Sequence, residues 1–112
     1  MEDWTPVIAD AQLRDGHAIR VTVGDADIFL CRLGDRVFAL DNRCNHMGGP
    51  LHKGVVKGDL QPTVTCPVHG SMFWLTDGRV VRGPASRPQL VFETRMNEGM
   101  VEVRLGAGPI EP

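Results

Sequence analysis

Four soft metal ligands, gathered in two short pairs, constrain this chain more than any other feature of its sequence. Cys44 and His46 form a C-x-H pair, and Cys66 and His69 form a C-x-x-H pair. Thiolate and imidazole groups are ligands that iron and zinc favour in proteins. Two such pairs in one short chain indicate a metal site that is built from two loops.

Each pair mixes one sulfur ligand with one nitrogen ligand, and this mixing is informative. A zinc finger usually takes both thiolates from one C-x(2–4)-C segment and both imidazoles from one H-x(3–5)-H segment. If the metal were instead a two-iron cluster with two Cys on one iron and two His on the other, each loop would supply one ligand to each iron. The two loops would then close over the cluster from opposite sides.

The segments CNHMGGPL, which begins at Cys44, and CPVHGSMF, which begins at Cys66, resemble the two cluster loops of Rieske-type [2Fe-2S] proteins. In Rieske centres two His replace two Cys on one of the two irons. The resemblance extends over roughly residues 28–105. It implies one [2Fe-2S] cluster per chain, with Cys44 and Cys66 on a buried iron and with His46 and His69 on the other iron, at the surface.

Some positions depart from the pattern of respiratory Rieske proteins, in which each loop carries an additional Cys and the two form a disulfide. The matching positions here hold Gly49 and Val68. Those proteins also place a Ser and a Tyr hydroxyl beside the cluster, and here Ser71 keeps the first while Phe73 lacks the second. Because fewer hydrogen bonds to sulfur lower the potential, the resemblance implies a value in the lower part of the Rieske range of roughly −150 to +300 mV.

Length and composition limit the class of protein. A chain of 112 residues is expected to form one domain, and 42% hydrophobic with 23% charged residues is typical of a soluble globular protein. No segment is long and apolar enough to span a membrane, and the acidic N-terminus is unlike a signal peptide. With two Cys assigned to metal, only Cys31 remains, so we expect no internal disulfide, a reducing compartment and a cytoplasmic protein without an N-terminal anchor.

Short β-branched and aromatic runs, punctuated by Gly and Asp, predict an all-β fold. We expect strands at residues 5–9, 17–23, 26–33, 36–41, 79–82, 90–95 and 100–105, with hairpin turns at Gly34-Asp35 and at Asn97-Glu98-Gly99. Cys31 alternates with Phe29 and Leu33 and is expected to be a core thiol. The fold class that we expect is an antiparallel β-sandwich or partial barrel.

A single Rieske [2Fe-2S] domain is expected to span residues 1–112. Its base comprises residues 1–42 and 76–105, the smaller cluster-binding subdomain is inserted at residues 43–75, and residues 106–112 form a loose tail.

Charge is unevenly distributed along the sequence. Residues 43–87 contain six basic and two acidic residues, a net charge of +4, whereas the remainder carries six basic and twelve acidic residues, a net charge of −6. We therefore expect a basic cluster end that docks on acidic surfaces of redox partners, by an attraction that weakens with salt. Met47 and Trp74 are candidate partner contacts, and His52 is a candidate proton or docking group.

The resemblance implies a one-electron carrier without a catalytic site of its own. It is most similar to the ferredoxin component of ring-hydroxylating dioxygenase systems, which carries electrons from a flavin-dependent, NAD(P)H-oxidising reductase to a terminal oxygenase. One alternative is the small Rieske subunit of assimilatory nitrite reductase, bound to its large subunit. Another is a zinc-stapled interaction domain. No nucleic-acid-binding motif and no membrane-binding segment stand out in the sequence.

Overall fold

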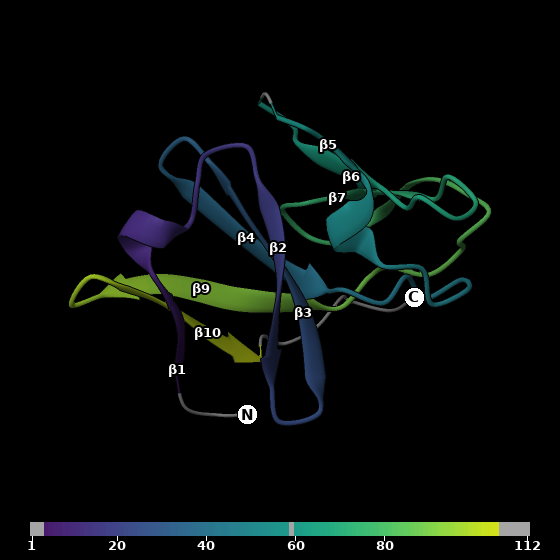
Figure 1. Ribbon diagram of the computed structural model, residues 1–112. Coiled ribbons are helices and arrows are strands. Elements are labelled where there is room, and N and C mark those ends of the chain that lie inside the picture. Colours follow the sequence, from purple (N-terminus) through teal and green to yellow (C-terminus); the bar gives the residue numbers. More distant parts are fainter. Residues whose placement is uncertain (1–3, 59, 106–112) are drawn as a thin grey trace.

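The computed structural model describes residues 4–58 and 60–105, and these residues form two antiparallel β-sheets (Figure 1). The expected tail at residues 106–112 lies outside the described residues. No α-helix occurs within the described ranges, where the helical segments are two short 3-10 turns, η1 (Asp10–Gln12) and η2 (Leu51–Lys53). The predicted all-β class, with a sandwich or partial barrel and a smaller inserted unit, is confirmed.

The larger sheet has six strands in the order β1-β10-β9-β4-β3-β2, and every neighbouring pair is antiparallel. The strands span β1 (Thr5–Ala9), β2 (Ala18–Val23), β3 (Ala26–Leu33), β4 (Arg36–Asp41), β9 (Val91–Asn97) and β10 (Met100–Leu105). The two edge strands, β1 and β2, approach each other, so the sheet curls into a nearly closed barrel. This barrel is the base on which the rest of the chain is built.

Both predicted hairpin turns are present. Gly34 lies in the left-handed region with φ of 66° in the turn between β3 and β4, as a two-residue hairpin loop requires. Glu98 and Gly99 have φ of 51° and 78° in the turn between β9 and β10. Two successive residues with positive φ are typical of the hairpin turn whose twist matches that of the flanking strands.

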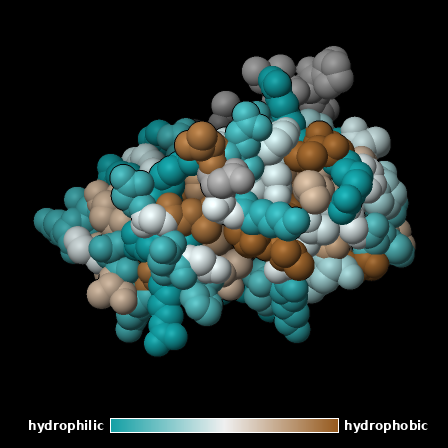
Figure 2. Space-filling model, turned by 90° about the horizontal axis from the view of Figure 1, so that it is seen from above, coloured by the Kyte–Doolittle hydropathy of each residue, from teal (hydrophilic) through white to brown (hydrophobic). Residues whose placement is uncertain are grey.

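The smaller sheet has four strands in the order β5-β6-β7-β8, namely β5 (Val55–Lys57), β6 (Thr63–Thr65), β7 (Met72–Trp74) and β8 (Val80–Arg82). Its last strand, β8, lies beyond residue 75, the predicted end of the inserted unit. Figure 2 faces the β5–β6 end from above and shows a band of hydrophobic residues among hydrophilic ones. Exposed apolar side chains near this end of the sheet include Val55 and Leu60.

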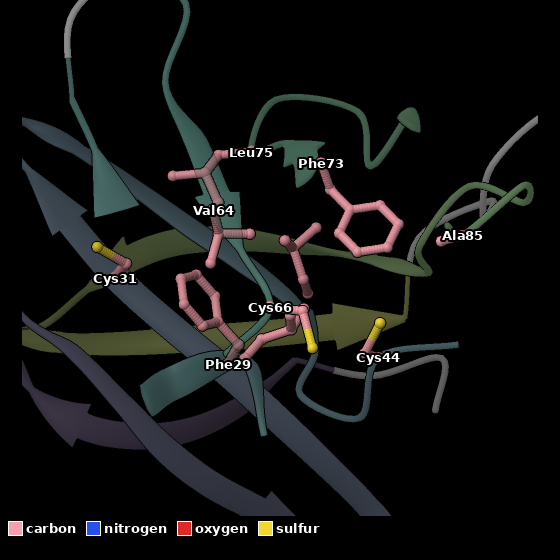
Figure 3. Close-up of a cluster of buried hydrophobic side chains, with 10 residues drawn as sticks. Phe29, Cys31, Cys44, Val64, Cys66, Phe73, Leu75 and Ala85 are labelled. Atoms are coloured by element: carbon pink, nitrogen blue, oxygen red, sulfur yellow. The ribbon is translucent and has the colours of Figure 1, made fainter. Parts of the chain in front are cut away.

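Strand β3 is buried on both faces and separates two hydrophobic cores. Ile28 and Leu30 point into the base, where they pack with Val101 and Val103 of β10. Residues on the opposite face pack against the small sheet, in a core that Figure 3 shows and that comprises Phe29, Cys31, Leu40, Cys44, Leu51, Val64, Cys66, Phe73, Leu75 and Ala85. Cys31 is a fully buried core thiol, as its alternation along the strand predicted.

Among the described residues, no helix is long and apolar enough to cross a membrane.

Candidate metal centre

The first ligand pair lies in a loop at residues 44–49, which we call the first loop. The Cys44 N–H donates to the carbonyl oxygen of Gly49 at 2.9 Å, and the Gly48 N–H donates to the carbonyl oxygen of Cys44 at 2.7 Å. Gly48 lies in the left-handed region with φ of 74°. These two backbone hydrogen bonds close the loop tightly.

The second ligand pair lies in a loop at residues 66–71, the second loop, which repeats this backbone arrangement. The Cys66 N–H donates to the carbonyl oxygen of Ser71 at 2.7 Å, and the Gly70 N–H donates to the carbonyl oxygen of Cys66 at 3.1 Å. Gly70 has φ of 80° and occupies the position that corresponds to the left-handed glycine of the first loop. Both loops therefore hold their Cys at the first position and a glycine at the fifth, although His69 stands fourth where His46 stands third.

The structure brings the four predicted ligands together as two chemically distinct pairs. Cys44 and Cys66 are each only 3% exposed, and their sulfur atoms lie side by side at the edge of the core (Figure 3). His46 and His69 are both exposed, with their ring centroids 5.6 Å apart and the ring planes at 85° to each other. One thiol and one imidazole thus come from each loop, with the thiols inside and the imidazoles at the surface.

The Cys44 thiol is poised between burial and backbone hydrogen bonds. Burial is the largest effect and raises its pKa, while the His46 N–H donates to the sulfur and lowers the pKa. The neighbouring Cys66 thiol raises the pKa further, and the Met47 N–H lowers it. Two thiolates side by side in this buried space need a compensating positive charge, which a metal ion supplies.

Gly49 lets the two loops approach each other closely. A Cβ at this position would lie 2.7 Å from the sulfur of Cys66 and 2.6 Å from Cγ2 of Val68, both too close for a real Cβ. It would also lie 3.2 Å from Cβ of Val68. The two positions that matched the disulfide of respiratory Rieske proteins are therefore adjacent here, and the contact between the loops is one of packing.

The donor set fits a [2Fe-2S] cluster of the Rieske type. Each iron of such a cluster takes two protein ligands, two thiolates on one and two imidazoles on the other. The structure provides one buried thiol pair, one exposed imidazole pair and backbone N–H groups directed at a Cys sulfur. Within residues 4–58 and 60–105, no three His, Cys, Asp or Glu side chains converge on the position of a single metal ion.

Two residues that support the first loop were not predicted from the sequence. Gln89, in the connection between β8 and β9, is buried, and its side chain bonds to backbone groups around the first loop. Asn45 lies between the two ligands of that loop and bonds back to the same connection. A Gln and an Asn in a polar segment look like ordinary surface residues, so the sequence carried no signal for Gln89 and only its position marked Asn45.

Ser71 and His52 are placed by further hydrogen bonds. The Ser71 hydroxyl oxygen accepts a hydrogen bond from the Ala85 N–H at 2.9 Å. His52 contacts the buried Asn42, with its Nδ1 3.0 Å from the amide nitrogen and its backbone N–H donating to the amide oxygen at 2.8 Å. The His52 ring is thus engaged in holding the segment that follows the first loop.

Other residues near the imidazoles, on the small sheet and on the base lie in different settings. Met47 is 63% exposed beside His46, and Val68 is 49% exposed beside His69, so an apolar rim borders the imidazole pair. Trp74 lines a pocket of about 270 Å³ with Leu60, Gln61, Thr76 and Asp77. On the base, the guanidinium carbons of Arg95 and Arg104 each lie 4.5 Å from the ring centroid of Trp4, and His17 lies exposed just before β2.

Comparison with protein families gives a match along almost the whole chain. Residues 3–101 match the family model for the Rieske [2Fe-2S] domain. The chain is 34% identical over 101 residues to Ferredoxin CarAc of Metapseudomonas resinovorans, an alignment that covers 89% of this chain and 92% of that protein.

Solved structures also match this chain along nearly its whole length. One match comes from a complex of reduced oxygenase and oxidised ferredoxin in carbazole 1,9a-dioxygenase, with a TM-score of 0.84, 32% identity, and coverage of 99% of this chain and 100% of the matched chain. Another is described as an NADH-dependent nitrite reductase small subunit from Mycobacterium tuberculosis, with a TM-score of 0.82, 26% identity, and coverage of 96% and 99%.

Proposed function

Because this chain belongs to the Rieske [2Fe-2S] domain family, we propose that it is a one-electron carrier, the ferredoxin component of an aromatic ring-hydroxylating dioxygenase system. The observation that carries this proposal is the match to ferredoxin-sized proteins along nearly the full length of both chains. One of these matches is a chain in a complex of oxygenase and ferredoxin in carbazole 1,9a-dioxygenase.

The proposed ligands are Cys44 and Cys66 on one iron and His46 and His69 on the other. When bound, the cluster supplies a one-electron redox couple. The buried thiols and the core around Phe73 keep water from the inner side of the site. The exposed imidazoles, with ring centroids 5.6 Å apart, form the side of the site that a partner can reach. His46 and His69 would therefore be the side of the site at which an electron is exchanged with a partner.

The rim of this site suits transient docking. Met47 and Val68 provide apolar contact next to the imidazoles, and the surrounding segment, residues 43–87, carries a net charge of +4. A flavin-dependent NAD(P)H reductase as donor and a terminal oxygenase as acceptor, meeting this chain in the cytoplasm, complete the proposed pathway. If acidic partner surfaces steer the encounter, raising the ionic strength will slow electron transfer to the oxygenase, and an unchanged rate would refute the steering.

The test of the function begins with the purified, anaerobically prepared protein. We expect two irons per chain, visible absorption that bleaches on reduction, and an electron paramagnetic resonance (EPR) signal of low average g in the reduced state. Reduction by a flavin reductase with NADH, followed by reoxidation with a ring-hydroxylating oxygenase, would establish the carrier role. Cys44→Ser and His69→Ala should each lose the pigment, whereas Cys31→Ala should keep it. A protein without iron, or a Cys44→Ser variant that keeps its colour, would overturn the proposal.

A second candidate is the small Rieske subunit of a nitrite reductase, favoured by the match to the Mycobacterium tuberculosis protein at 26% identity. Size-exclusion chromatography of the protein from its native host separates the two functions. A free ferredoxin elutes as a small protein, whereas a subunit elutes with a large flavoprotein. A zinc-stapled domain, the third possibility, would be colourless and contain zinc.

A further inference from the structure

Gln89 is a buried side chain with hydrogen bonds to the backbone on both sides of Cys44. It is only 1% exposed. Its amide nitrogen donates to the carbonyl oxygen of Asp41 at 2.7 Å and to that of Arg43 at 2.6 Å, and its amide oxygen accepts from the Asn45 N–H at 3.1 Å. One side chain thus fixes the peptide groups immediately before and after Cys44.

The Asn45 side chain in the first loop bonds in turn to the backbone just before Gln89. Its amide nitrogen donates to the carbonyl oxygen of Arg87 at 2.8 Å and to that of Pro88 at 2.9 Å. Residues 87–89 and the segment 41–45, which leads into the first loop, are therefore joined by five hydrogen bonds between side chain and backbone, in both directions. A link of this kind specifies one relative placement, since each amide has its donors and its acceptor in a fixed plane.

The backbone of Gln89 is itself held in place by the turn that follows β7. Its N–H donates to the carbonyl oxygen of Gly78 at 2.8 Å. A Cβ on Gly78 would lie 2.1 Å from the carbonyl oxygen of Gln89, so these two residues are in close backbone contact that only glycine permits. The Gln89 side chain therefore extends from a rigid support, the turn after β7, to the first loop.

We propose that Gln89 is a positioning residue that sets the geometry of the first loop, and with it the placement of Cys44 and His46 around the cluster. This inference rests on the proposed ligands. Residues that hold metal ligands by hydrogen bonds fix ligand orientation, and their substitution typically costs about 10- to 100-fold in metal affinity or activity. Gln89 acts on Cys44 through the two peptide groups that flank it, and on His46 through Asn45.

The test compares Gln89→Met with the unaltered protein, both loaded with the cluster. Met has nearly the length of Gln and no hydrogen-bonding groups that replace the amide, so this substitution removes the three hydrogen bonds while it fills the space. We expect the cluster to be lost to an iron chelator roughly 10-fold faster under argon. We also expect shifted g values in the EPR spectrum of the reduced protein, a change that a general loss of stability would not produce.

Two further variants complete the experiment. Asn45→Ala, at an exposed residue, removes the return hydrogen bonds and should raise the rate of cluster loss by a smaller factor. Thr94→Val removes a hydrogen bond of 3.0 Å to the carbonyl oxygen of Val37 on the base, and it should leave both the rate and the g values unchanged. If Gln89→Met does not fold, Gln89→Glu takes its place in the same two measurements, since it keeps the acceptor of the Asn45 N–H and removes the two donated hydrogen bonds.

The outcomes separate this inference from the proposed function. Gln89→Met with unaltered g values and an unaltered rate of cluster loss would overturn the positioning role and leave the carrier function intact. The same result for Thr94→Val as for Gln89→Met would also overturn it, because the effect would then be general. An unaltered protein that never contains iron would instead overturn the proposed function.

Discussion

The two loops of the metal centre share one backbone frame but rest on different supports. Each loop begins with a Cys whose N–H and carbonyl oxygen close it by two backbone hydrogen bonds. The second loop sits at the end of the β6–β7 hairpin, where the ladder continues through Thr65 paired with Met72. The first loop has one isolated bridge behind it, between Arg43 and Pro50, and depends on the side-chain amides of Gln89 and Asn45.

This difference teaches that similar ligand geometry can be reached in two ways. In the second loop the strand ladder fixes the register, so the identity of the neighbouring side chains matters less. In the first loop the buried side-chain amide of Gln89 holds the backbone in place of a strand ladder. A single substitution far along the chain can therefore change the geometry of the site.

The largest effect is expected at Gly49, where the two loops meet. In Gly49→Ala the added Cβ would overlap the sulfur of Cys66, which a bound cluster would hold in place, and also Val68. We expect iron content to fall well below that of the unaltered protein, with cluster loss to a chelator accelerated by about 10- to 100-fold. Adding Val68→Ala should not restore the cluster because the overlap with the sulfur remains. Full iron content in Gly49→Ala would show that the loops need no close contact.

The next effect concerns Cys31, the buried thiol that lies outside both loops. Burial is the larger effect, with the nearby Asp15 carboxylate second, and together they raise its pKa from 9.0 to about 11. The unfolded chain therefore loses this proton near pH 9, while the folded chain keeps it to about pH 11. Stability falls as the pH rises through that interval, by at most about 3 kcal/mol.

Urea unfolding of the protein at pH 8 to 11 measures this loss. Cys31→Ala is the control, since its stability should fall less over the same interval. Equal pH dependence in both proteins would show that Cys31 does not titrate as its burial implies.

A smaller effect, and one that should be equal in the two loops, is expected at Gly48 and Gly70. Both have positive φ, 74° and 80°, and an added Cβ on either meets no atom within 4 Å. Replacement by Ala should therefore cost only the backbone strain of the left-handed region, about 1–2 kcal/mol in each case. Thermal unfolding of the two variants measures this directly. A much larger loss in one variant would mean that the two frames are not equivalent.

The smallest effect is expected for Ser71→Ala in the second loop. This change removes the acceptor of the Ala85 N–H, which costs about 1 kcal/mol of stability. It also removes the hydroxyl that the resemblance places beside the cluster, so we expect a lower reduction potential than in the unaltered protein. A redox titration checks the potential, with Ser86→Ala, at an exposed Ser nearby, as the control. An unchanged potential would show that the hydroxyl does not reach the cluster.

Much of the fold followed from the sequence. Strands at residues 5–9, 26–33, 36–41 and 100–105 match their predicted bounds, because alternating apolar residues and turn glycines such as Gly34 mark them on both sides. Strands β5, β6 and β7 were not predicted individually. Each has only three residues, and Val64 and Phe73 are the only fully buried members, so they leave no alternation to read.

The candidate site, like the fold, could be predicted from the sequence only in part. The ligand residues stand out because Cys and His are rare and closely spaced, and the buried thiols and exposed imidazoles agree with that reading. Their role as ligands stays a prediction until iron is measured. The roles of Gln89 and Gly78 could not be predicted from the sequence, because their contacts join residues that are far apart in the chain.

The separate supports of the two loops also bear on the order in which the chain folds. The backbone hydrogen bonds that close the second loop lie within residues 63–74, so we expect this loop to close as soon as that short hairpin has formed. The first loop waits for Gln89, whose partners lie 44 to 48 residues away. Contacts between residues so far apart in the sequence form slowly, because the entropic cost of closing a long loop must be met before the contacts stabilise the chain. We therefore expect the second loop to form early and the first loop to be completed only when Gln89 has packed against it.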